Sequence, residues 1–304
     1  KTLFPYTTLF RSRRKATMVH RQQDGVGRVH QDRGGCLAGM DEFEQHRRRR
    51  GRSDRARQEQ HAAGDILAVL GVAHIGDAHE DLAYGCMTVW RFGQIEKPAF
   101  GLSDLDHYFA AYEAAGGRPV ERDRFHFWLV YRTLWWALGC LQMGEFWRSG
   151  SDASLERTVI SRRTSENELD LLMLLETEAP AAERAAPLPP PAPALPAATG
   201  ETSASEILGA ISDWMAADLK PKASGRDKFM VVVAMNALGM VRRELDRPVT
   251  VTDKALADQL LAGEATLATP GLLPRLRRAA LDKLTNDVPK YAALAKARAL
   301  WGDA

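Results

Sequence analysis

Residue types that commonly do chemistry are present in this chain, but their spacing does not match a catalytic or metal site. The three cysteines, Cys36, Cys86 and Cys140, lie far apart and form no C-x-x-C pair, so neither a zinc knuckle nor a disulfide scaffold is predicted. No histidine has a partner four residues away on a predicted helix, and no Gly-x-Ser-x-Gly element or Cys/His nucleophile pair is visible. We therefore expect four histidines to be solvated or core side chains: His74, His79, His107 and His126.

One stretch resembles a known family. Residues 73–93, AHIGDAHEDLAYGCMTVWRFG, are similar to the segment that follows the metal-binding motif in the aminoglycoside phosphotransferase family, whose fold is protein-kinase-like. The similarity continues through AAYEAAGGRPV at 110–120, FWLVYRTLWWALGC at 127–140 and ERTVISRRTSENELDLL at 156–172. The resemblance implies the helical lobe of a kinase-like small-molecule phosphotransferase. In the intact family, ATP and magnesium serve phosphoryl transfer to a hydroxyl on a small-molecule acceptor.

The end of the chain carries a second resemblance. VAMNAL at 233–238, RREL at 242–245 and DVPKY at 287–291 resemble an uncharacterised helical domain that accompanies or is fused to such phosphotransferases. This resemblance implies a small helical bundle and no particular chemistry.

Two aspartates match the sequence motif of the phosphotransferase family. Asp81 corresponds to the aspartate of the D-L-A element, and the resemblance implies that it supports the catalytic loop by accepting backbone hydrogen bonds. Asp77 corresponds to the aspartate of G-D-P, with Ala78 in place of the proline. Capping of a helix that starts here would use the same two carboxylates, because free N–H groups at a helix start attract acidic side chains. We expect both to be structural, and we predict no catalytic, cofactor-binding or metal-binding residue.

The catalytic loop of a kinase-like fold is absent from the sequence. Such a loop has the form H-x-D-x-x-x-x-N, with the Asp taking the substrate proton and the Asn helping to hold magnesium. His30-Gln31-Asp32 imitates its start, but Leu37 stands where the Asn belongs. The chain has only three asparagines, Asn167, Asn236 and Asn286, and none of them lies upstream of the matched segment.

The groups that hold the nucleotide are also absent. Only Lys1 and Lys15 precede Lys97, and no complete glycine-rich phosphate loop is visible. Asp65 is out of position for the metal-binding aspartate. We therefore expect a truncated, inactive phosphotransferase that binds no cofactor. The alternative is a non-catalytic helical interaction or regulatory module.

The first 65 residues do not look like a protein domain. Thr2 to Ser12, TLFPYTTLFRS, resemble the conceptual translation of a sequencing adapter. From Arg13 to His61, 13 basic residues face 7 acidic ones, and only seven residues are Ile, Leu, Val, Met or Phe, too few to form a core. We interpret residues 1–65 as artefactual or out of frame, and disordered. The alternative is a basic arm, with its arginine run at 47–50, that binds nucleic acid.

From residue 66 the chain is predicted to be mainly α-helical. Apolar spacing predicts a helix over residues 79–92. A capping box at Ser103 and Asp106 predicts the start of a second helix. A third helix is predicted over 123–147, where the residues are apolar nearly all round, which implies burial on several sides. Another helix is expected to open at Ser151 or Ser154 and to run to about residue 173. A capping box at Ser203 and Glu206 opens the first of five short helices in the last hundred residues.

Composition suggests where the domains divide. Seven of the seventeen residues from Pro180 to Pro196 are proline, which predicts a semi-rigid spacer. We expect a phosphotransferase lobe at 66–176, a Pro/Ala-rich linker at 177–200 and a helical domain at 201–304. The apolar stretch at 125–143 contains Arg132, and its uncharged part is too short to span a membrane. We expect a cytoplasmic protein with no membrane or nucleic-acid partner, and the sequence leaves its oligomeric state open.

Overall fold

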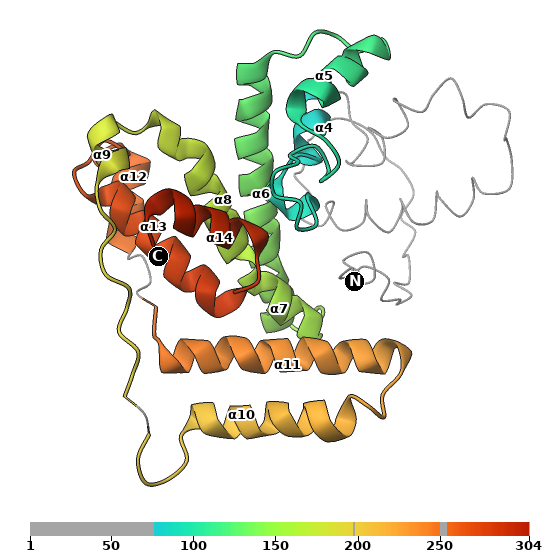
Figure 1. The fold of residues 1–304 in the computed structure, drawn as a ribbon, viewed down its shortest axis with the longest axis vertical. Helices are drawn as coiled ribbons and strands as arrows, with labels where there is room; N and C mark the ends of the chain where they lie inside the picture. Colours follow the sequence, from blue (N-terminus) through green and yellow to red (C-terminus); the bar gives the residue numbers. More distant parts are fainter. Residues whose placement is uncertain (1–75, 197, 250–253, 304) are drawn as a thin grey trace, which may run out of the picture. The chain divides into compact units, whose positions relative to one another are not determined.

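The computed structural model describes residues 76–196, 198–249 and 254–303, and within these ranges the chain is mainly helical with no strand (Figure 1). The prediction of a mainly α-helical chain is therefore confirmed for the described residues. The expectations for residues 1–65, including His30 and Asp32, lie outside them. No described helix combines the length and the apolar character needed to cross a bilayer.

Helix α4 (Ala78–Tyr84) is shorter than expected, and the prediction of a helix to residue 92 is wrong. The chain turns at Gly85 because the Phe100 ring fills the space beside its Cα: an added Cβ would lie 2.0 Å from the ring. The Phe100 N–H also donates to the Gly85 carbonyl at 3.1 Å. A short 3-10 turn, η1 (Thr88–Trp90), follows, so the apolar spacing after Gly85 comes from a turn rather than from a continuous helix.

Helix α5 (Leu105–Ala114) starts at a different cap from the one expected. Asp104 is the capping residue, and its Oδ1 accepts the His107 N–H at 2.8 Å. The predicted capping box of Ser103 and Asp106 is wrong, because the Ser103 hydroxyl donates instead to the carbonyl of Asp104. On the buried side, the Phe109 ring packs edge-on against a phenylalanine of the next helix at a centroid distance of 4.8 Å.

Helix α6 (Arg122–Arg148) is the long helix that the sequence predicted, and α4 packs along it. The single helix expected next is two helices, α7 (Leu155–Arg162) and α8 (Thr164–Leu175), which break at Arg163. Two nitrogens of the Arg163 guanidinium donate to the Glu166 carboxylate at 2.7–3.2 Å, which ties the break to the first turn of α8. A 3-10 turn, η2 (Glu176–Glu178), ends this part of the chain.

The proline-rich stretch runs against a helix surface. It contains the short helix α9 (Ala181–Ala185), and further along the Ala192 N–H donates to Asp282 at 3.3 Å. The Leu195 N–H donates to the Asp246 carbonyl at 2.8 Å. These contacts attach the predicted spacer to the helices that follow it, while the domain division drawn there stays a prediction.

The remaining helices are α10 (Ala204–Trp214), which continues as the π-helical turn η3 (Met215–Leu219), α11 (Gly225–Asp246), α12 (Lys254–Ala262), α13 (Leu272–Asp287) and α14 (Ala292–Trp301). Helices α10 and α11 lie side by side as a hairpin (Figure 1). The predicted capping box at the start of α10 is confirmed in both halves. The Ser203 N–H donates to the Glu206 carboxylate at 2.6 Å, and the Glu206 N–H to the Ser203 hydroxyl at 3.2 Å.

A shared hydrophobic core joins α8 to α13 and α14. It brings a leucine from the stretch that resembles a phosphotransferase together with residues from the last hundred: Leu169, Ala280, Leu281, Leu284, Ala293, Leu294, Ala297 and Trp301. Three of these residues are alanines, whose small side chains let the helices approach closely.

Candidate functional site

The two motif-matched aspartates stand at the start of α4. Asp77 directly precedes this helix, and Asp81 lies in its first turn beside Glu80. The Glu80 carboxylate is buried and lies 3.3 Å from Nη1 of Arg132 on α6, so the first turn of α4 is joined to α6 by a buried ion pair. Both aspartates are thus placed where carboxylates favour a helix start. A structural role for Asp77 and Asp81 stays a prediction.

An aromatic cluster surrounds that ion pair. The Arg132 guanidinium lies over the rings of Tyr84 and Trp135, at 5.0 and 4.9 Å from their centroids. Trp136 packs against Trp90 at 5.5 Å and is buried. These contacts balance the desolvation of the arginine and make α4 and α6 one packed unit. Trp147, at the far end of α6, is exposed.

The described cysteines are unsuited to nucleophilic chemistry. Cys86 and Cys140 are both buried free thiols. Burial raises the pKa of each to about 12, against an ordinary value near 9. A thiol that stays protonated at neutral pH is a poor nucleophile and a poor metal ligand.

The described residues contain no ready-made cluster of metal ligands. In the described ranges, no group of three or more His, Cys, Asp or Glu side chains is arranged to hold a metal ion. The described histidines do not converge: His79 on α4 accepts the Glu121 N–H through Nε2 at 3.0 Å, while His107 lies on α5.

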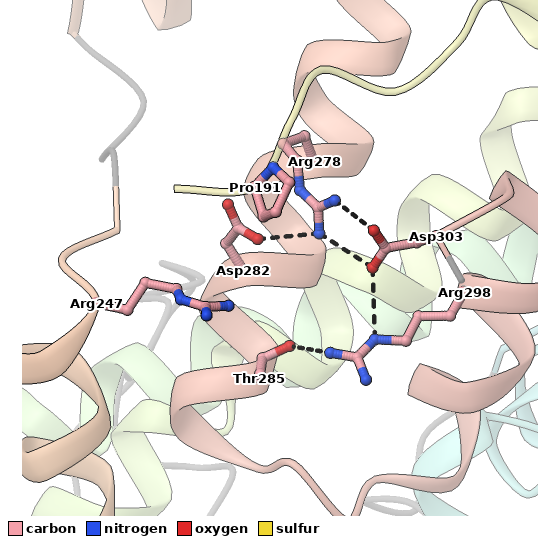
Figure 2. A pocket seen from close by; sticks show the side chains of 7 residues that line it. All are labelled: Pro191, Arg247, Arg278, Asp282, Thr285, Arg298 and Asp303. Carbon is pink, nitrogen blue, oxygen red and sulfur yellow. Dashed lines mark hydrogen bonds and ion pairs between the residues drawn. The ribbon is translucent and has the colours of Figure 1, made fainter. Parts of the chain in front are cut away.

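The structure instead assembles a pocket that the sequence did not reveal. It has a volume of about 220 Å³ and lies between the end of α11, α13, α14 and the proline-rich stretch (Figure 2). Seven residues line it: Pro191, Arg247, Arg278, Asp282, Thr285, Arg298 and Asp303. Three guanidinium groups and two carboxylates thus share one small space. Four elements far apart in the sequence supply them, and no local motif could have indicated the cluster.

A second feature, the long helix α6, leaves apolar side chains uncovered. The exposed positions of its middle part are all large and apolar, between 45 and 59 % exposed: Phe127, Tyr131, Leu134, Leu138 and Leu141. Their spacing of four and three residues places them in one stripe along the helix, called the α6 stripe below. The helix is therefore buried on part of its surface and exposed along this stripe.

Comparison of the chain with protein-family models, with curated proteins and with solved structures found no match.

Proposed function

We propose that residues 66–176 are the helical lobe of a kinase-like small-molecule phosphotransferase, and that residues 201–304 are its helical companion. One observation carries the proposal. In the described residues, the stretches that resemble the aminoglycoside phosphotransferase family lie in order on α4 and the turn after it, the end of α5, α6 and the α7–α8 pair, and α4, α7 and α8 all pack on α6.

The α6 stripe gives independent support. A contiguous row of five large apolar side chains on one helix is more than a soluble monomer usually leaves uncovered. A helix that belongs to a larger two-lobed protein would have such a face covered by a neighbouring element. The stripe is what this proposal expects for a lobe without the rest of its domain.

In the intact relative, the activity would be transfer of the γ-phosphoryl group of ATP to a hydroxyl of a small molecule, with magnesium, in the cytoplasm. The present chain is proposed to be inactive, because its sequence contains no H-x-D-x-x-x-x-N loop. Asp81 would then act only by holding the start of α4 in place.

A helical interaction or regulatory module is the second candidate. The exposed apolar side chains of α10, Ile207, Ile211 and Trp214, favour it together with the α6 stripe. Both faces would then bind partner proteins, and the missing catalytic groups would be a natural loss.

The source DNA separates the two candidates. Reading the DNA upstream of codon 66 in all three frames is expected to reveal an H-x-D-x-x-x-x-N segment in a frame other than the translated one. If no frame encodes such a segment, the phosphotransferase proposal fails and the module is favoured.

An enzymatic assay tests the proposed inactivity. We expect no magnesium-dependent ATP turnover from the purified chain, with or without hydroxyl acceptors. Asp81→Asn serves as the control, since turnover that is equal in both proteins comes from a contaminating kinase. Turnover that is lost in the Asp81→Asn protein, while its far-UV circular dichroism is unchanged, would contradict the proposal.

A further inference from the structure

The charges in the pocket of Figure 2 are not balanced. Three arginines face two aspartates, so the pocket holds one more positive than negative formal charge. An uncompensated guanidinium beside two others is costly where solvent is partly excluded, and a bound anion removes that cost.

Both carboxylates pair with Arg278, and Asp303 also lies near Arg298. The side chain of Arg278 is only 9 % exposed; one of its nitrogens lies 2.6 Å from Asp303 and the other 2.9 Å from Asp282. Asp282 also accepts the Ala192 N–H. This buried triad fixes the floor of the pocket and attaches the proline-rich stretch and the end of the chain to α13.

Arg247 and Arg298 have guanidinium N–H donors that are not used by the described residues. Arg298 donates through Nη2 to the Thr285 hydroxyl at 2.9 Å, and its Nε lies 3.5 Å from Asp303, while Nη1 has no partner among the described residues. For the Arg247 side chain, no hydrogen bond or ion pair is found within the described ranges. Figure 2 shows Arg247 reaching toward Thr285 from the side opposite Arg298.

The size of the pocket limits the ligand. A volume of about 220 Å³ is below the range of roughly 300–1,000 Å³ that is usual for sites of drug-sized molecules. Its lining is mostly polar, with guanidinium, hydroxyl and carboxylate groups, and the guanidinium and hydroxyl groups suit oxygen acceptors rather than an apolar group. A tetrahedral oxyanion, alone or with a short organic substituent, fits both limits.

We propose that this pocket binds a small oxyanion of the phosphate class, held between the guanidinium groups of Arg247 and Arg298. Each guanidinium presents a planar fork of N–H donors that matches two oxygens of such an anion. The inference concerns the C-terminal helices alone and does not rest on the phosphotransferase proposal.

The test measures phosphate binding by the full chain. Inorganic phosphate is titrated by calorimetry and followed by thermal unfolding, against sodium chloride at matched ionic strength. We expect phosphate to bind and to raise the unfolding midpoint, since a ligand that binds only the folded state stabilises it. Glycerol 3-phosphate is the second probe: tighter binding than inorganic phosphate identifies a phosphate monoester as the ligand, and weaker binding identifies the free ion.

Two variants with the same charge change locate the site. Arg247→Gln removes a guanidinium with no protein partner in the described structure, so the fold is expected to persist while phosphate affinity falls about tenfold or more. Arg275→Gln is the matched control, because Arg275 is exposed on α13 and does not line the pocket. We expect Arg275→Gln to bind phosphate like the unmodified chain.

Two results would overturn the proposal. One is a phosphate effect no larger than that of chloride at equal ionic strength. The other is an equal loss of affinity in the Arg247→Gln and Arg275→Gln proteins, which would mean that only the overall charge matters. Should Arg247→Gln fail to fold, the Nε–Hε resonance of Arg247 in the unmodified chain decides, because phosphate must shift it if the proposal holds.

Discussion

Helices α6 and α13 differ in how their composition relates to their burial. The middle of α6 is almost entirely apolar, yet it exposes the α6 stripe. Helix α13 reads LLPRLRRAALDKLTND, with charges throughout, yet it buries five polar or charged side chains: Arg277, Arg278, Asp282, Asn286 and Asp287. Burial in this molecule therefore depends on which partners are available as much as on side-chain hydrophobicity.

The buried charges of α13 are tolerated because partners from distant elements meet them. Arg277 pairs with Glu176 at 2.7 Å, and Asp287 pairs with Arg162 on α7 at 2.6 Å. A buried charge without such a partner would be expensive, and a hydrogen-bonded counter-charge offsets much of its desolvation cost. The α6 stripe has no comparable partner within the described residues.

The largest effect is expected where a buried pair of α13 is broken. One Glu176 oxygen accepts two bonds from Arg277, at 2.7 and 3.0 Å, and one from the Trp301 indole N–H at 2.7 Å. Glu176→Ala leaves Arg277 buried without its counter-charge, so the free energy of unfolding should fall by about 3–5 kcal/mol in urea denaturation. Glu178→Ala, at an exposed position two residues on, is the control and should change it by less than about 0.5 kcal/mol. Equal effects of the two substitutions would show that the pair does not stabilise the fold.

A second pair of variants replaces one leucine in each helix by alanine and compares the loss of stability. Leu281 of α13 is fully buried in the core with α8 and α14, whereas Leu141 of α6 is 53 % exposed. Leu281→Ala removes buried methyl groups and leaves a cavity, so we expect a loss of about 2–5 kcal/mol in chemical denaturation. Leu141→Ala should cost less than about 1 kcal/mol. A large cost at Leu141 would mean that the α6 stripe is covered in the folded chain.

The contact between α8 and the start of α14 is expected to respond to pH. Asp170 accepts the Tyr291 hydroxyl at 2.7 Å, and its burial raises its pKa to about 7, with Glu166 adding to the rise and Arg91 opposing it. An acid whose pKa is raised by folding contributes stability that is full below its unfolded pKa of about 4 and is lost as the pH rises through about 7.

Substitution of that aspartate tests the assignment. In Asp170→Asn, the decline in unfolding free energy between pH 4 and 8 should be smaller than in the unmodified chain, as measured by urea titrations at a series of pH values. If the unfolding free energy declines equally in both proteins, another group causes the pH dependence. The next candidate is the buried Asp287, because burial raises its pKa as well.

The sequence predicted some local features of the helices but not others, and it predicted their surroundings poorly. The bounds of α6 and the capping box of α10 follow from short-range patterns, apolar content in one case and a Ser-x-x-Glu element in the other. The end of α4 at Tyr84 could not be predicted in this way, because it depends on the Phe100 ring packing against Gly85 from fifteen residues away.

The pocket shows the same limit more strongly. Asp77 and Asp81 could be placed at the start of a helix from their motif, since that placement is local. Arg247, Arg298 and Asp303 come together only because α11, α14 and the chain end meet at α13, and no spacing in the sequence encodes that meeting.

A polar substitution in the α6 stripe is expected to have the smallest effect on stability. It also gives the sharpest test of the difference between the exposed apolar face of α6 and the buried charges of α13. Leu138 is 56 % exposed, so Leu138→Gln should change the unfolding free energy by no more than about 0.5 kcal/mol. It should nevertheless reduce concentration-dependent association in sedimentation velocity, because it interrupts a contiguous apolar row. Leu261→Gln on α12 is the control: Leu261 is 87 % exposed but lies outside the stripe, so its loss should leave association unchanged. If the two variants associate to the same extent, the exposure of single leucines governs association, and the continuity of the row does not. Helices α6 and α13 would then differ only in the charged side chains that α13 buries.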